Sequence, residues 1–314
     1  MSEVAMIGAV EIGLVFALVG LGVYLAFRVL DFPDLTVDGS FPLGAAVAAT
    51  MIVAGMNPWL ATAAAMVAGA AAGLVTATLN VRFHILHLLA SILTMIALFS
   101  VNLRVMGRPN VAIIMQETVL TPFYGLGLSD HYVRPLFVLV VVVVAVLLLA
   151  RFLASEFGLA MRATGVNARM ARAQGVSTDL HVYVGMALSN ALVGLAGALF
   201  DQTNGFADVT AGVGTIVVGL AAVIVGETLL RTRALVLALV GCVVGSILYR
   251  LAIQAALSAD AIGLKASDLN LVTAVLVAVA LILPRIRVRA GAGARTGTKA
   301  GAKAGVKKAG MGAR

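Results

Sequence analysis

The chain has 314 residues, of which 61% are hydrophobic and only 11% are charged, whereas soluble domains carry about 25% charged residues. The mean hydropathy is +1.08, and several apolar runs are long enough to cross about 30 Å of hydrocarbon. This composition excludes a water-soluble enzyme. It predicts an all-α, polytopic transmembrane helical bundle, because a helix satisfies its own backbone hydrogen bonds inside lipid.

The apolar runs predict about nine membrane spans. In chain order they cover residues 7–27, 41–56, 58–80, 85–103, 135–153, 181–200, 213–230, 234–257 and 268–284. The dipeptide Asn57-Pro58 separates the second and third spans and predicts a tight turn between two helices. The N-terminal sequence lacks the positive region and the cleavage site of a signal peptide, so the first apolar run is expected to remain as a span.

The net charge of +8 comes from the C-terminal end of the chain. From Arg285 onward there are nine Lys or Arg residues and no acidic residue, while the rest of the chain is nearly neutral. We therefore expect a transmembrane domain at residues 1–284 and a disordered Gly/Ala/Lys-rich tail at residues 285–314, which is unable to bury a core. Its basic charge beside a span favours anionic lipid over nucleic acid as its partner.

The distribution of positive charge predicts the orientation, because cytoplasmic loops are enriched in Lys and Arg. With the basic tail in the cytoplasm, eight further Arg residues lie on the cytoplasmic side and four basic residues lie outside. The inner set is Arg28, Arg82, Arg151, Arg162, Arg169, Arg172, Arg231 and Arg233; the outer set is Arg104, Arg108, Arg134 and Lys265. The N-terminus is then outside the cell.

Two segments of the chain are similar to each other. Residues 17–36 and 191–210 align without a gap at an offset of 174 residues, and nine of the twenty positions are identical. Both copies contain the motif Phe-x-Asp-x-Thr. Ala/Gly/Val-rich sequence can resemble itself by chance, but it produces this motif less readily than the other identical positions. The copies begin on spans that cross in opposite directions, so the sequence predicts inverted internal repeats, an arrangement found in many transporters.

Polar residues inside or beside the spans are candidates for a substrate path, since each costs free energy unless it faces the bundle interior or water. The candidates are Asp34, Thr36, Ser189, Asn190, Asp208 and Thr210; Glu11, Asn102, Glu227 and Arg250 are further polar residues in spans. Helix capping is an alternative role for the two Asp-x-Thr pairs. Hydrogen bonds between helices are the alternative for the Ser-Asn pair. Glu227 is expected to pair with Arg231, four residues later on one helix.

The remaining motifs favour helix packing over chemistry. Two glycine pairs with GxxxG spacing, Gly69 with Gly73 and Gly241 with Gly245, predict close helix contacts. No metal site is expected, because Cys242 is the only cysteine and the pair His84 and His87 has no third ligand nearby. The spans contain no HExxH, GxSxG or paired catalytic carboxylates, so no catalytic residue is assigned and an intramembrane enzyme is not expected.

The most polar long loop on the expected cytoplasmic side covers residues 154–180. It predicts a short amphipathic helix or helix pair, with apolar side chains available to pack and arginines available to project. The apolar set is Leu159, Met161, Met170 and Ala173; the basic set is Arg162, Arg169 and Arg172. Such a loop can dock another protein, or it can lie on lipid headgroups. The spacing alone does not decide between these two roles.

Eight residues of this loop form a pattern: Gly158, Ala160, Arg162, Ala163, Gly165, Asn167, Ala171 and Gly175. The pattern resembles the cytoplasmic loop of permeases in the branched-chain amino acid and ribose class of ABC importers. The resemblance extends from about residue 8 to residue 285. DLTVDGSFPLGAAVAA and RFHILHLLASILTMIAL resemble segments of ribose-type permeases. DFPDLTVDGSF, NLRVMGRPN and NGFAD together resemble the tryptophan/tyrosine-type permease subfamily.

The resemblance implies a permease subunit of an ATP-driven importer in a bacterial cytoplasmic membrane. Its implied partners are a second permease copy, cytoplasmic ABC ATPases and an external solute-binding protein that delivers a small organic solute, with an aromatic amino acid as the implied substrate. The implied ATPase-coupling residues are Gly158, Arg162, Ala163, Gly165, Asn167, Arg169, Ala171 and Gly175. Arg162 is expected to contact the ATPase, and Gly165 and Gly175 to form the turns that aim the helix.

No cofactor is expected in this chain. It has no GxxxxGK[ST] phosphate loop, so ATP must be hydrolysed by a partner subunit. An ion- or proton-coupled secondary transporter is the alternative function, because inverted repeats serve that class as well. That alternative predicts ionisable groups near the membrane midplane, and besides Glu11 and Arg250 the spans hold few of them.

Overall fold

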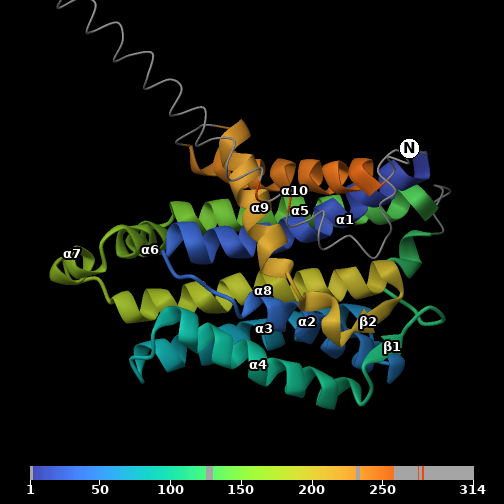
Figure 1. Cartoon of the computed structure of the whole chain (residues 1–314), viewed down its shortest axis with the longest axis horizontal. Helices are drawn as coiled ribbons and strands as arrows, with labels where there is room; N and C mark the ends of the chain where they lie inside the picture. The colour runs from blue at the N-terminus through green and yellow to red at the C-terminus, as the bar shows by residue number, and fades with distance from the viewer. Residues whose placement is uncertain (1–2, 125–129, 231–233, 258–274, 276–277, 279–314) are drawn as a thin grey trace, which may run out of the picture.

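The computed structural model describes residues 3–124, 130–230, 234–257, 275 and 278 (Figure 1). The first half of the chain contains α1 (Glu3–Val23), a π-helical turn η1 (Tyr24–Val29), α2 (Val37–Val53), α3 (Pro58–Val81), α4 (His87–Met106), β1 (Asn110–Ala112) and a 3-10 turn η2 (Thr121–Phe123). The second half contains α5 (Asp130–Ala154), α6 (Glu156–Val166), α7 (Ala168–Ala173), α8 (Thr178–Asn204), β2 (Phe206–Asp208), a 3-10 turn η3 (Val209–Gly212), α9 (Thr215–Leu229) and α10 (Leu235–Leu257).

Seven helical segments in the described residues are long and apolar enough to cross a membrane, and the shorter apolar helix α2 adds an eighth segment. These eight segments match the first eight predicted spans. The ninth, at residues 268–284, falls outside the described residues except for positions 275 and 278, and the basic tail, Arg231, Arg233 and Lys265 fall outside them as well. The bundle is helical except for β1 and β2, which pair antiparallel with Asn110 opposite Asp208.

The long helices other than α9, which crosses them steeply, run roughly parallel, so the bundle has two ends (Figure 1). The short helices α6 and α7 project from one end, and β1, β2 and the N-terminus lie at the other. Helix α1 packs against α5, α9 and α10, while α8 packs against α2 and α3. The contact between α1 and α8 joins these two groups of helices.

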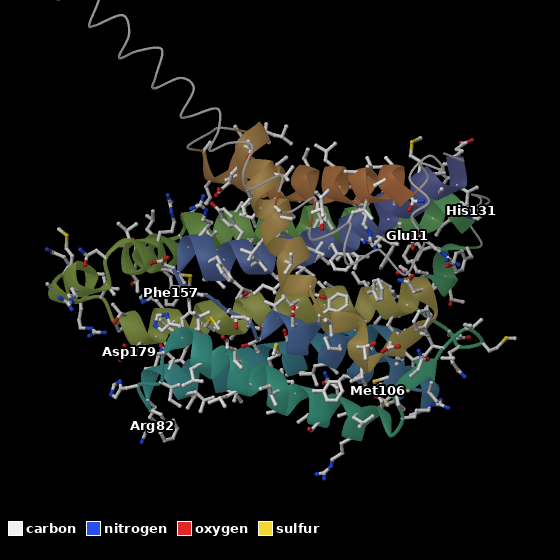
Figure 2. All side chains as sticks on the ribbon, viewed as in Figure 1. Glu11, Arg82, Met106, His131, Phe157 and Asp179 are labelled. Carbon is white, nitrogen blue, oxygen red and sulfur yellow. The ribbon has the colours of Figure 1, made fainter. Side chains whose placement is uncertain are left out.

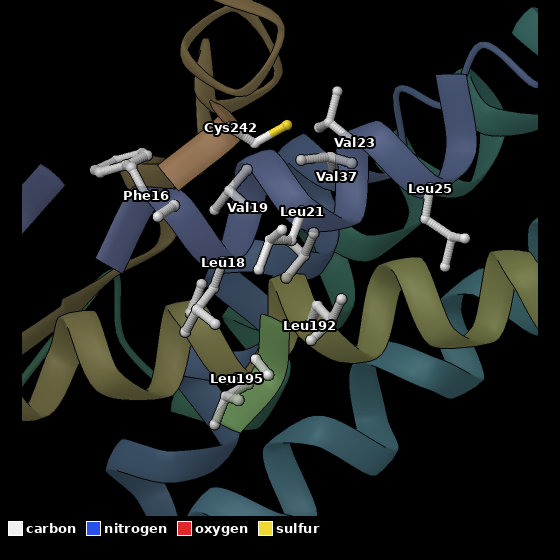
Figure 3. Close-up of a cluster of buried hydrophobic side chains, with 14 of the residues drawn as sticks. Phe16, Leu18, Val19, Leu21, Val23, Leu25, Val37, Leu192, Leu195 and Cys242 are labelled. Atoms are coloured by element: carbon white, nitrogen blue, oxygen red, sulfur yellow. The ribbon is translucent and has the colours of Figure 1, made fainter. Parts of the chain in front are cut away.

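Helix α1 occupies the centre of the core. Every residue from Gly13 to Val23 is buried, as expected for a helix that is apolar on all sides and surrounded by other helices. Figure 3 shows its side chains, among them Leu18 and Leu21, between Leu192 of α8 and Cys242 of α10. The single cysteine is thus a buried core residue.

The predicted glycine contacts are confirmed. A Cβ at Gly69 would overlap the carbonyl of Asn190, and a Cβ at Gly73 would overlap the carbonyl of Met186, so both glycines let α3 approach α8. Gly241 and Gly245 do the same between α10 and α9, where a Cβ at Gly245 would overlap the carbonyl of Ala222. Small residues allow helix backbones in a membrane to approach closely.

Candidate functional site

The loop at residues 154–180 folds into the helix pair α6–α7, as predicted. Ser155 precedes α6 and its hydroxyl accepts a 3.3 Å hydrogen bond from the N–H of Gly158. Asn167 ends α6, and its side-chain oxygen accepts a 3.0 Å hydrogen bond from the N–H of Met170 at the start of α7. These are helix caps, which satisfy N–H groups that have no partner within a helix. Gly175, with φ +84°, forms the turn toward α8.

Gly165 does not form a turn, contrary to the prediction. It lies inside α6, where a Cβ would overlap the carbonyl of Val29 at the end of η1. Gly158 has a similar role, since a Cβ there would overlap the carbonyl of Phe152. Gly165 thus brings α6 close to the end of η1, and Gly158 brings it close to the end of α5.

The basic side chains of the helix pair differ in their contacts. Arg172 donates a 2.6 Å hydrogen bond to the hydroxyl of Thr178 and forms a 3.3 Å ion pair with Asp179, which anchors α7 to α8. Arg162 and Arg169 are exposed and form no hydrogen bond or ion pair with any described residue. Their positive charges are therefore available to a partner.

A groove of about 520 Å³ lies on this helix pair. Of the four apolar residues that were expected to pack, only Met161 is fully buried. The side chains of Leu159 and Met170 are 53% and 63% exposed. Both exposed side chains line the groove beside Arg162. An exposed apolar surface next to a free cation is typical of a protein contact site. Of the remaining predicted coupling residues, Ala163 and Asn167 are exposed and line the groove, and Ala171 is buried beneath it.

In Figure 2, Arg82 and Asp179 lie at the α6–α7 end of the bundle, while Glu11 and His131 lie at the opposite end. Arg28, at the end of η1, forms an ion pair with Glu227 of α9, and its Nε donates a 2.6 Å hydrogen bond to that carboxylate. Glu227 therefore has a partner that the sequence analysis did not predict, while its expected partner Arg231 lies outside the described residues. Sequence spacing suggested a neighbour on one helix, but the fold brings a residue 199 positions away into contact.

A second cluster, which we call the buried polar network, consists of Asp34, Thr36, Ser40, Thr76 and Asn190, all with no exposed surface. Asn190 of α8 donates a 2.7 Å hydrogen bond to Asp34 and accepts one of 2.7 Å from Ser40. The hydroxyl of Thr36 lies 2.7 Å from that of Thr76 on α3. The network therefore joins α2, α3 and α8 without contact with solvent.

Ser189, beside Asn190, donates a 2.7 Å hydrogen bond to the carbonyl of Gly22 on α1. The prediction that Ser189 and Asn190 form hydrogen bonds between helices is confirmed. The hydroxyl of Ser246 on α10 donates a comparable 2.7 Å hydrogen bond to the carbonyl of Gly13. These bonds join the first half of the chain to the second at several depths of the bundle.

The two Asp-x-Thr pairs form the same local turn at different places. Asp34 accepts a 2.9 Å hydrogen bond from the N–H of Thr36, and Asp208 accepts a 2.7 Å bond from the N–H of Thr210. The expected capping role is confirmed for Asp208, which caps η3. Desolvation raises the pKa of Asp208, but the hydrogen bonds from Thr210 and Asn110 outweigh it and leave this pKa below its ordinary value. The fold does not bring this pair into the buried polar network.

Asp38 has a role that the sequence did not indicate. Its carboxylate, on α2, accepts hydrogen bonds from the N–H groups of Gly214 at 3.2 Å and Ile216 at 2.7 Å. These groups lie at the N-terminus of α9, where unpaired N–H groups and the helix dipole favour a negative charge. Because the two segments are 176 residues apart or more, no local sequence signal identifies this cap.

The described residues contain no group of three or more His, Cys, Asp or Glu side chains that could hold a metal ion. The ring of His87 stacks on that of Phe32 with a centroid separation of 4.3 Å, so this histidine has a packing contact. Arg250 lies over the ring of Phe16, 5.3 Å from its centroid. A cation above an aromatic ring is stabilised by the charge distribution of the ring.

The fold defines a multi-pass membrane protein with an exposed helix pair at one end. The chain matches the family model described as "Branched-chain amino acid transport system / permease component" over residues 6–284. The chain belongs to this family. It is the permease component of a bacterial ABC transporter rather than an enzyme, and ATP is hydrolysed by the partner ATPase. The family predicted from the sequence is confirmed.

Two relatives and one solved structure are similar to the chain. The "Tyrosine transport system permease protein" of Clostridioides difficile (strain R20291) is 33% identical over 265 residues, which cover 84% of this chain and 86% of the relative. The "Uncharacterized protein RP368" of Rickettsia prowazekii (strain Madrid E) is 34% identical over 64% of this chain and 69% of the relative. PsaBC from Streptococcus pneumoniae in complex with Fab has a TM-score of 0.50 and 16% identity, covering 88% of this chain and 89% of that one; this likeness concerns the fold alone.

Proposed function

We propose that the chain forms, as a homodimer, the translocation path of an importer for a small organic solute, and that this solute is an aromatic amino acid. An external solute-binding protein delivers the substrate, and two cytoplasmic ABC ATPases supply the energy. The substrate assignment is supported by the 33% identity to a protein named as a tyrosine transport permease. The ATP-driven mechanism is supported by the family and by the helix pair α6–α7.

The observation that carries this proposal is the exposed groove on α6–α7. Arg162 has no partner in the described residues, and the apolar side chains beside it are exposed. We assign this surface, with Gly158, Ala163, Gly165, Asn167, Arg169, Ala171 and Gly175, to the contact with the ATPase. An amphipathic pair that only rested on headgroups would not need the glycine contacts that attach α6 to the ends of α1 and α5.

The proposed movement is a rocking of two inverted repeats. The offset of 174 residues relates α1 to α8, α2 to α9 and α3 to α10. The observed packing has the corresponding symmetry, since α3 packs on α8 and α10 packs on α1. Single contacts correspond to within one residue: Gly73 approaches Met186, and Ile247, the counterpart of Gly73, is approached by Gly13, which follows the counterpart of Met186. Repeats of this kind transport substrate by moving against each other.

In this proposal the buried polar network holds the repeats together in the present conformation. Asn190 and Ser189 belong to the second repeat, and their partners Asp34, Ser40 and Gly22 belong to the first. Asp34, Thr36, Ser189 and Asn190 then border the path only after the repeats separate, and Asp208 and Thr210 lie near its outer end. The basic tail at residues 285–314 adds a contact with anionic lipid on the cytoplasmic side.

The proposal is tested by reconstituting the permease with its ATPase in proteoliposomes, with the solute-binding protein added outside. We expect uptake of labelled L-tyrosine that requires internal ATP and the binding protein, with L-leucine and D-ribose as comparison solutes. ATP-independent uptake driven by a proton or sodium gradient would establish the secondary-transporter alternative instead. An Arg169→Cys variant should react with a membrane-impermeant thiol reagent only from the cytoplasmic side, and labelling from outside would contradict the coupling assignment.

A further inference from the structure

A cavity of about 390 Å³ lies between α2, α4 and the segment that leads from η3 to α9. Its lining includes Asp38 and Pro42 of α2, Phe99 and Asn102 of α4, and Val209 and Val213 beside η3. Cavities that bind small molecules are mostly apolar, contain a few polar groups and measure roughly 300–1,000 Å³. The cavity has this composition and size.

One polar atom in the lining has no partner. The side chain of Asn102 has no exposed surface, and its Nδ2 donates a 3.1 Å hydrogen bond to the carbonyl of Gly39. Its Oδ1 accepts no hydrogen bond from any described residue. A buried amide oxygen without a donor costs free energy. A ligand with N–H or O–H groups in the cavity would supply that donor.

Asp38, which precedes Gly39 in the chain, is a carboxylic acid residue of the same lining. Asp38 accepts hydrogen bonds from the backbone of α9 only, and no described Lys, Arg or His side chain forms an ion pair with it. An ionised group at membrane depth is costly unless it borders a wet path or meets an opposite charge. The cavity therefore has the chemistry of a cation site at one end, with Phe99 and Val213 providing an apolar wall.

The cavity opens on the side of the bundle. Ile96 and Phe99, in the middle of α4, are 60% and 52% exposed. Val213, on the opposite rim, is 76% exposed and precedes Gly214, whose φ is +83°. The cavity is thus bounded on one side by the turn at which α9 begins, so a movement of the second repeat changes its shape.

From these observations we infer that the cavity binds the substrate during translocation. The ammonium group of the substrate contacts Asp38 and the Oδ1 of Asn102, and its apolar or aromatic body packs against Phe99. The substrate class is a primary amine with an apolar body, which includes the aromatic amino acids. This inference rests on the proposed function for the direction and energy source of transport, and it adds the site.

The first test measures uptake of L-tyrosine by the complete reconstituted transporter. Asn102→Leu keeps the branched shape of the side chain, although Leu is larger, and removes the amide oxygen; we expect kcat/KM for uptake to fall about tenfold. The matched control is Thr94→Val, because Thr94 is a buried residue of α4 whose hydroxyl bonds only to Ala90 of its own helix. Unchanged uptake by Asn102→Leu would overturn the inference.

The second test does not depend on the Asn102 variant. The Phe99→Cys variant is treated with a water-soluble methanethiosulfonate reagent. Val101→Cys is the control, because Val101 is exposed on α4 but does not line the cavity. The wild type, whose Cys242 is buried, gives the background reaction. We expect rapid reaction at position 99, slowed at least fivefold by L-tyrosine or phenethylamine but not by 3-phenylpropionate, which has no ammonium group.

The results separate the inference from the proposed function. If the wild type imports no tyrosine but amines protect the cysteine at position 99, the proposed substrate is wrong and the cavity assignment stands. If tyrosine is imported but position 99 is unreactive, or is protected equally by 3-phenylpropionate, the cavity assignment is wrong. A cysteine at position 99 that reacts no faster than one at position 101 would show that the cavity faces lipid.

Discussion

The side-chain amide of Asn190 donates a 2.7 Å hydrogen bond to the carboxylate of Asp34, and both side chains are completely buried. The donor lies on α8 and the acceptor lies 156 residues earlier, in the segment that enters α2. A carboxylate in this position depends on its hydrogen bonds, because burial without them is very unfavourable. This bond therefore connects the stability of the first half of the chain to that of the second.

Replacing Asn190 with Leu is expected to lower the free energy of unfolding by about 3 kcal/mol, because Asp34 and Ser40 both lose their partner and remain buried. The measurement is unfolding of the detergent-solubilised permease by titration with SDS. Asn204→Leu is the control, since Asn204 is exposed at the end of the same helix. An equal loss in both variants would show that the network contributes nothing specific.

Gly165→Ala should displace α6 from η1, because the added Cβ would overlap the carbonyl of Val29. Overpacking of a tight contact costs about 1–3 kcal/mol, and we expect the ATPase stimulation by substrate-loaded binding protein to fall severalfold as well. Gly8→Ala, at a position where a Cβ meets nothing within 4 Å, serves as the control. Normal coupling in Gly165→Ala would contradict a rigid attachment of α6 to α1.

Arg162→Ala is expected to reduce the substrate transported per ATP hydrolysed by about tenfold, and Arg162→Glu by more. The reason is that Arg162 is a free cation beside the exposed apolar groove, and a charged contact that loses its partner is weakened by about 1.4 kcal/mol or more. The measurement is uptake and ATP hydrolysis in the same proteoliposomes. Arg151→Ala, an exposed arginine at the end of α5, should behave as the wild type. Unchanged transport in both Arg162 variants would refute the assignment.

The ion pair between Arg28 and Glu227 should contribute less than about 1 kcal/mol to stability, because the Arg28 side chain is 56% exposed and the pair is screened by solvent. The measurement is a double-mutant cycle with Arg28→Ala and Glu227→Ala in the same unfolding assay. The coupling energy should decrease further at high salt. A value above 2 kcal/mol would place this pair among the main contacts between α1 and α9.

The sequence predicted the parts of the fold that depend on composition and local spacing. Apolar runs located the eight described spans, and GxxxG spacing located the close contacts of α3 with α8 and of α10 with α9. The family followed from motifs spread over most of the chain. Each of these signals is either local or repeated, so it is visible without knowledge of the tertiary structure.

The site was predictable in position but not in detail. The loop at residues 154–180 forms a helix pair, yet Gly165 packs inside α6, because a close approach to Val29 leaves no trace in local sequence. Glu227 has a neighbouring arginine in sequence and a different one in space. Asn102 was recognised as a polar residue in a span, but its unpaired oxygen depends on where α2 lies.

The cap that Asp38 provides for α9 has a consequence for how the protein is made. The ribosome completes Asp38 long before it reaches Gly214 and Ile216, whose N–H groups require that carboxylate. During insertion, the N–H groups at the start of α9 therefore gain this acceptor only after the earlier helices have reached their positions. The N-terminal half thus serves as a template for the C-terminal half, and the order of synthesis matches the order in which the contacts are needed.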